Sequence, residues 1–141
     1  MRSTSVELDL APRLRLALAR SARRLRQEAG THLSPSLTAA LATIERHGPL
    51  TPSELAARER VQRPTITRIA ARLEELGLVA RAADPGDRRS ALINVTTAGR
   101  ELLASARTRK DAFLSERLEA LGAADRATLE RAAALLEDML E

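Results

Sequence analysis

Polar side chains that can form hydrogen bonds with nucleic-acid bases gather at the start of one short predicted helix. Between Gln62 and Gly77 apolar residues recur at offsets of three and four, as expected for the buried face of a helix. Gln, Thr and Arg carry donors and acceptors that match base edges, and a helix N-terminus also favours phosphate. We therefore predict a DNA recognition helix; the alternative is an ordinary amphipathic helix with a solvated face. The outer positions near its start are Gln62, Arg63, Thr65, Thr67 and Arg68.

Both ends of this predicted helix carry boundary signals. Pro64 suits the first helical turn, where its missing N–H is not needed, and Gly77 suits the left-handed position just past a helix end. These signals fix which face of the helix is turned towards the core. The predicted buried positions are Ile66, Ile69, Leu73 and Leu76.

A second short helix is predicted directly before it. Thr51 and Glu54 form a T-x-x-E capping box, and Pro52 follows the cap at the first helical position. A turn of about four residues then leads into the recognition helix, and two helices joined in this way are typical of a helix-turn-helix. Ser53 is a candidate phosphate contact by type and position, with an ordinary residue of a capped first turn as the alternative.

After Gly77 the apolar period changes from 3.6 to 2, which predicts strands. Residues 78–82 and 91–95 are rich in Leu, Val and Ile, and the intervening ADPGDRRS contains turn formers. A hairpin directly after a helix-turn-helix is a winged helix. Arg88 and Arg89 near its tip would enter a minor groove or bind phosphate. The alternative is a solvated turn in which these arginines pair with Asp87.

Long helices are predicted on both sides of the winged domain. Residues 1–5 are expected to form a frayed leader before a helix over 6–29, and Thr96 should cap a helix over 97–121 that precedes another over 124–139. Their apolar stripes exceed what one small domain would cover, so a second copy of the chain is the expected partner. The predicted interface residues are Leu10, Leu14, Leu18, Leu118, Leu121, Leu129, Leu136 and Leu140.

The predicted fold is therefore mainly α with a small β hairpin. A winged helix-turn-helix domain over 34–98 is flanked by an N-terminal dimerisation helix within 1–33 and C-terminal dimerisation helices within 99–141. Ser34 and Pro35 supply the cap and first-turn proline that open the domain.

Composition agrees with a helical globular protein that binds nucleic acid. The 141 residues are 44% hydrophobic and 30% charged, and Phe113 is the only aromatic, so the core must be built from aliphatic side chains. Lys110 is the only lysine among 23 basic residues. Arginine is the better partner for phosphate and guanine, although a bias towards arginine can also follow from the base content of a genome.

Several classes of function lack the residues they need. The chain contains no cysteine, which excludes disulfides, thiolate metal sites and thiol redox sensing. His32 and His47 have no nearby carboxylate or second histidine at ligand spacing, and no nucleophile–base set or phosphate-binding glycine loop is present. No apolar run has the length of a membrane span or resembles a signal peptide. We expect a cytoplasmic protein that is not an enzyme and needs no cofactor or metal.

Residues 50–99 resemble the MarR family of bacterial transcriptional regulators. The resemblance lies in LTPSELAARERVQRPTITRIAARLEELGLVARAADPGDRRSALINVTTAG, and the match extends over essentially the whole chain. Asp87 and Arg89 match the D-x-R of the family's wing, and the run from Val95 through Thr96 to Gly99 matches its "LT…G". The resemblance implies a homodimeric repressor or activator that binds a near-palindromic double-stranded operator. Such regulators are often released by a small phenolic or lipophilic ligand.

The resemblance also implies roles for individual residues. Asp87 falls where a carboxylate usually steadies the wing, and Arg88 and Arg89 fall where the wing reaches the minor groove. Two alternatives to a sequence-specific regulator, taken here as a repressor, are a non-specific architectural DNA-binding protein and a winged-helix protein-interaction module. The positions expected at the major groove and its phosphates are Gln62, Arg63, Pro64, Thr65, Thr67 and Arg68.

Overall fold

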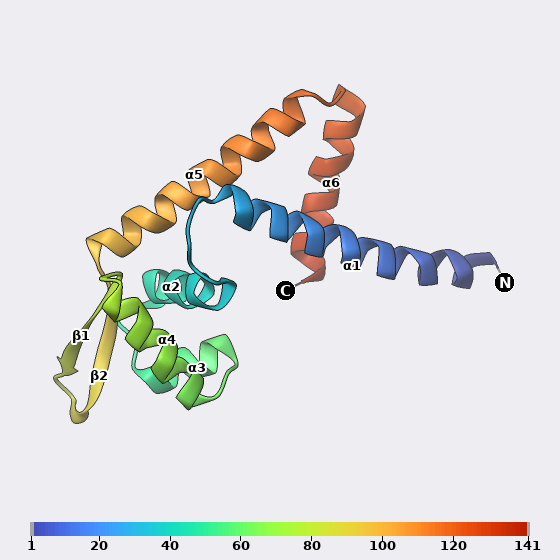
Figure 1. Cartoon of the computed structure of the whole chain (residues 1–141). Helices are drawn as coiled ribbons and strands as arrows, with labels where there is room; N and C mark the ends of the chain where they lie inside the picture. Colours follow the sequence, from blue (N-terminus) through green and yellow to red (C-terminus); the bar gives the residue numbers. More distant parts are fainter. Residues whose placement is uncertain (1, 141) are drawn as a thin grey trace.

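The computed structural model describes the backbone of residues 2–140 and the side chains of residues 9–87 and 89–140. Over this range the chain forms six helices and one antiparallel hairpin (Figure 1), which confirms the predicted fold class. The elements in chain order are α1 (Arg2–Glu28), α2 (Pro35–His47), α3 (Pro52–Glu59), α4 (Arg63–Glu75), β1 (Val79–Asp84), β2 (Asp87–Val95), α5 (Thr97–Glu119) and α6 (Ala123–Met139).

The winged domain is built around an aliphatic core shared by α2, α3, α4 and the hairpin. Leu50 adds a bridge to β2: its N–H donates to the Ile93 carbonyl at 2.9 Å, and the Ile93 N–H donates back at 2.7 Å. This pairing joins the segment before α3 to the sheet. The core continues past residue 98, because Leu103 on α5 is buried in the same cluster. The largest fully buried side chains are Leu41, Ile44, Leu55, Ile66, Leu73 and Ile93.

Side-chain caps confirm the predicted starts of α2 and α3. The Ser34 hydroxyl accepts a hydrogen bond from the Leu37 N–H at 3.2 Å. Thr51 accepts from the Glu54 N–H at 3.2 Å and donates to the Glu54 carboxylate at 3.0 Å. The first backbone N–H groups of a helix have no intrahelical acceptor, and the two hydroxyls accept from one such group each. The bond from the Thr51 hydroxyl to the carboxylate fixes the Glu54 side chain in the first turn. These caps determine where α2 and α3 begin.

Two details of the helices differ from the sequence-based expectation. The predicted frayed leader over residues 1–5 is wrong for the part described, since α1 begins at Arg2. No glycine or proline occurs before Pro12 to end a helix, and α1 continues through that proline. Leu76 was expected on the buried face of α4, but it is the C-cap residue and is 41% exposed. Ala70, which is 1% exposed, lies in the core instead.

The hairpin is longer and its turn is tighter than predicted. The strands reach Asp84 and resume at Asp87, so that only Pro85 and Gly86 lie between them. Asp84 Oδ1 accepts a hydrogen bond from the Gly86 N–H at 2.9 Å. This Asx-type bond stabilises the two-residue turn where a longer loop was predicted. Arg89, expected near the tip of a loop, therefore lies within β2 close to the turn.

The terminal helices extend away from the winged domain (Figure 1). The first part of α5 packs on the domain through Leu103, whereas α6 has no buried residue. The N-terminal helix α1 packs against α5. Within residues 2–140, no helix is long and apolar enough to cross a membrane.

Candidate nucleic-acid interface

The recognition helix α4 turns its polar side away from the core. Ile66, Ala70 and Leu73 are almost completely buried, and they fix the orientation of the helix. Because these positions follow the helical period, the remaining side chains of the first turns face outwards. Most of the predicted DNA contacts are exposed, and Thr65 is half-buried. The exposed ones are Gln62, Arg63, Pro64, Thr67 and Arg68.

The turn that joins α3 to α4 is shorter than predicted. Only Arg60, Val61 and Gln62 lie between the two helices. Arg60 has φ 55° and ψ 43°, a left-handed conformation that is uncommon for a residue other than glycine. The Val61 N–H donates to the Ala56 carbonyl at 3.1 Å and closes the turn. The sequence carried no signal for this conformation, since glycine or asparagine would be the usual residue there.

Ser53 and Arg63 are brought together at the exposed junction of α3 and α4. Arg63 Nη1 donates to Ser53 Oγ at 2.9 Å. One turn further along α4, the Thr67 hydroxyl donates to the Arg63 carbonyl at 3.0 Å. The Thr67 hydroxyl oxygen retains a lone pair that can accept a hydrogen bond from a base or a water molecule. Two residues predicted separately, one as a phosphate contact and one at the major groove, thus form one unit.

The wing is attached to the C-terminal end of α4. Arg81 Nε on β1 lies 2.6 Å from Glu74 Oε2, and the two side chains are 34% and 48% exposed. Nothing in the spacing of these two residues indicated that they would pair. The ion pair links the first strand of the hairpin to the recognition helix, while the buried Leu78 and Val79 join the same region to the core.

Asp87 stabilises the wing by bonds to backbone and hydroxyl groups. Its Oδ1 accepts the Arg89 N–H at 2.9 Å, and its Oδ2 accepts from the Ser90 hydroxyl at 3.4 Å. Among the described side chains, no ion pair joins Asp87 to Arg89, which departs from the alternative of a turn held by mutual pairing. The side chain of Arg88 lies outside the described residues. The exposed guanidinium of Arg89 therefore projects from a strand whose start is fixed by the carboxylate.

These features define a winged helix-turn-helix protein. Helix α4 and the hairpin lie at one end of the molecule, and the long terminal helices extend towards the other (Figure 1).

Comparisons with known proteins identify the family of winged helix-turn-helix proteins to which the chain belongs. Residues 33–91 match the family model described as MarR family. An uncharacterized HTH-type transcriptional regulator of Mycobacterium bovis is 41% identical over 128 residues, which are 90% of each chain. A protein of Pseudomonas aeruginosa PA01 whose crystal structure is named as a transcriptional regulator is 33% identical, with a TM-score of 0.86 over 96% of both chains. The chain belongs to the MarR family, and it is a DNA-binding transcriptional regulator.

A structure with bound nucleic acid shares the fold. A point mutant of MepR from Staphylococcus aureus, bound to an oligodeoxyribonucleotide, has a TM-score of 0.72 and covers 93% of this chain and 97% of its own. Because its sequence identity to this chain is only 18%, the similarity concerns the fold alone.

Proposed function

We propose that the protein is a homodimeric repressor that binds a near-palindromic operator in the cytoplasm through α4 and the wing. The observation that carries this proposal is the exposed polar start of α4, held in place by its buried opposite face. The MepR mutant bound to DNA supports the same use of this fold. In this proposal Gln62, Arg63, Pro64, Thr65, Thr67 and Arg68 contact the major groove and its phosphates. Arg89, together with Arg88, reaches the minor groove.

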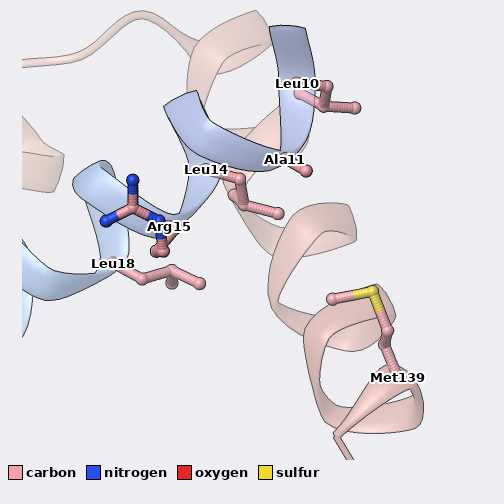
Figure 2. A pocket seen from close by; sticks show the side chains of 6 residues that line it. All are labelled: Leu10, Ala11, Leu14, Arg15, Leu18 and Met139. Carbon is pink, nitrogen blue, oxygen red and sulfur yellow. The ribbon is translucent and has the colours of Figure 1, made fainter. Parts of the chain in front are cut away.

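Exposed apolar side chains on the terminal helices support the dimer. Leu10 is 57% exposed, Leu129 48% and Leu140 72%, and Leu18 is also exposed. Leu10, Leu14 and Leu18 on α1 border an apolar hollow of about 530 Å³ together with Met139 on α6 (Figure 2). A second copy related by a two-fold axis would cover this surface with the same surface of its own. Leu118, Leu121 and Leu136, which are half-buried, would complete the contact.

A nuclease footprint on genomic DNA tests the proposed function. A regulator of this kind should protect one bounded palindrome. Protection along the whole fragment would instead indicate an architectural protein, and no protection at all would indicate a protein-interaction module. Selecting and sequencing the bound fragments supplies the operator for the experiments below.

Release by a small lipophilic or phenolic ligand is a further part of the proposal. It is supported by the family resemblance and by the volume of the apolar hollow beside α1, which lies within the range of small-molecule sites, roughly 300–1,000 Å³. A ligand that occupies this hollow would compete with the proposed dimer contact. Added compounds of this class should then shift the operator complex towards free DNA in a gel.

We expect Arg68→Ala and Arg89→Ala to weaken operator binding in different ways. Arg68 is placed to read a base edge, so its loss should cost about 1 to 3 kcal/mol on the best site and relax the preference at one base pair. Arg89 is placed on the wing, so its loss should weaken binding evenly across sequences and reduce the salt slope by about one unit per phosphate contact. Titrations of single-base operator variants at several salt concentrations measure both effects.

Arg20→Ala is the charge-matched control for these two variants. Arg20 is exposed on α1, away from the recognition helix, and its removal should leave the affinity for the operator nearly unchanged. Equal loss of base preference in the Arg68 and Arg89 variants would contradict the division of roles.

A double-mutant cycle on Ser53 and Arg63 should distinguish two roles for the serine. If Ser53 acts by holding the Arg63 guanidinium, Ser53→Ala should weaken binding in the wild type but have no further effect after Arg63→Ala. If Ser53 contacts phosphate itself, the two losses should add. The expected result is a coupling of about 0.5 to 1.5 kcal/mol, the range of a net hydrogen bond. Affinities measured for the four proteins on one operator decide between these outcomes.

A further inference from the structure

Helix α5 holds two other helices through arginines that lie two residues apart. Arg107 Nη1 is 2.9 Å from Glu45 Oε1 on α2, and the Glu45 side chain is only 23% exposed. Arg109 Nη1 donates to the Ala29 carbonyl just after α1, at 3.2 Å. Residues two apart on a helix point to nearly opposite sides. The same turn of α5 therefore contacts the winged domain on one side and the end of α1 on the other.

The Arg109 guanidinium lies directly on Gly30. This glycine has φ +68°, and a Cβ at this position would overlap Arg109 Nη1 and come within 3.2 Å of its Cζ. Glycine is therefore favoured here by its backbone conformation, and an added Cβ would also displace the guanidinium from its seat. Ala29, whose carbonyl accepts the bond, is 3% exposed. The link between α1 and α2 thus begins with a backbone fixed against α5.

We call the contact of Arg109 with Ala29 and Gly30 the joint between α5 and the end of α1. It is closely packed, and a second contact between α1 and α5 lies further along the two helices. The cavity beside Ala29, lined by Leu33, Leu102 and Ala106 among others, measures about 20 Å³. That is room for about one water molecule, so the helices have little space to slide. One turn beyond Arg109 on α5, the Phe113 ring stacks with the Arg24 guanidinium of α1 at 5.1 Å from the ring centre. The last turns of α1 are attached to α5 at two points.

We infer that Arg109, seated on Gly30 and bonded to the Ala29 carbonyl, is a positioning residue that sets the half-site spacing accepted by the dimer. This inference rests on the proposed dimer. In that dimer α1 carries part of the contact between the two copies, while α4 moves with the winged domain. The angle at the joint therefore determines how far apart the two recognition helices lie. If the joint is loosened, each recognition helix should still bind its half-site, but the distance between the two recognition helices should vary.

The separation can be measured directly because the chain contains no cysteine. A single Arg72→Cys on the exposed side of α4 accepts one spin label per subunit, and pulsed electron paramagnetic resonance then gives the distance distribution between the two labels. Gly30→Ala, which displaces the guanidinium, and Arg109→Gln, which removes the charged fork, should both broaden the distribution. Arg109→Lys, which retains a charge and a donor, should broaden it less.

Gly77→Ala is the matched control. Gly77 has φ +75°, but nothing lies within 4 Å of the position that its Cβ would occupy. It carries the same backbone strain as Gly30→Ala without a displaced neighbour, so its distance distribution should remain as narrow as that of the wild type.

A spacing series on DNA gives the second measurement. The palindrome selected by the wild-type protein is altered by adding or removing one base pair at its centre. Preference for the original spacing should fall about fivefold or more in Gly30→Ala and Arg109→Gln, a fold-change at the lower end of typical coupling between sites. A role in stability alone would lower the unfolding temperature but leave this ratio unchanged.

The outcomes separate this inference from the proposed function. Unchanged distance widths and unchanged spacing preference in folded, dimeric variants would overturn it, and so would equal broadening in Gly77→Ala. If Gly30→Ala does not fold, Arg109→Lys and Arg109→Gln decide the question by the same two measurements. A wild-type protein that is monomeric or leaves no bounded footprint would overturn the proposed function itself, before any variant is made.

Discussion

Inserting five base pairs between the half-sites of the operator should abolish binding by both recognition helices at once. Two α4 helices related by a two-fold axis must meet major grooves on the same side of the duplex. This requires half-site centres about 10 bp apart, one helical turn. Five additional base pairs rotate one half-site by about half a turn, so that its groove faces away from the second helix.

The expected loss in affinity is large because half of the specific contacts disappear together. Specific sites are typically bound about 10³ to 10⁷ times more tightly than other DNA, so losing one half-site should cost roughly a hundredfold or more. Inserting ten base pairs restores the facing but lengthens the separation by one turn, beyond the reach of a rigid dimer. A gel-shift series over these insertions measures the effect.

The control for this series is a five-base-pair insertion outside the palindrome, which should leave the affinity unchanged. If the insertion between the half-sites also has no effect, the subunits bind independently and the proposed architecture is wrong. The wings should protect flanking minor grooves, which would make the footprint longer than the two half-sites.

Placing two glutamates on the apolar stripe of α1 should convert the protein to a monomer. Leu10→Glu with Leu18→Glu changes two side chains that are 57% and 39% exposed in the single chain, so its own fold should tolerate them. In the dimer, each carboxylate would enter an apolar contact, and burying an unpaired charge costs several kcal/mol. Because each 1.4 kcal/mol is a factor of ten, the dimer should dissociate at micromolar concentration.

Sedimentation and operator titration together measure this effect. The double variant should sediment with the mass of one chain and lose two or more orders of magnitude in operator affinity, since one recognition helix would bind without the other. Leu16→Glu is the matched control: Leu16 is 43% exposed but lies two residues from Leu18, on nearly the opposite side of α1. A double variant that remains dimeric would place the contact elsewhere.

The sequence by itself determined the order of the elements and most of their boundaries. Caps act within one helical turn, so Ser34 could be identified from the adjacent Pro35, and Thr51 from Glu54 three residues away. Glycine is the usual left-handed residue just past a helix end, so the conformation of Gly77 could also be predicted locally. The structure gives this residue φ +75° just past α4. The outer polar face of α4 was predictable because helical period alone separates it from Ile66 and Leu73, which are fully buried.

The tertiary structure decided which of these side chains meet. The pairing of Leu50 with Ile93, the ion pair of Glu74 with Arg81 and the seat of Arg109 on Gly30 join residues that are distant in the sequence or belong to different elements. Local pattern sets the conformation of each segment, but such contacts depend on how the packed helices lie relative to one another. The wing shows the same limit, because the length of its strands depends on pairing across the hairpin as well as on turn residues. The sequence thus identified the residues of the candidate interface, and the packing of α4 against α3 and the hairpin decided their arrangement.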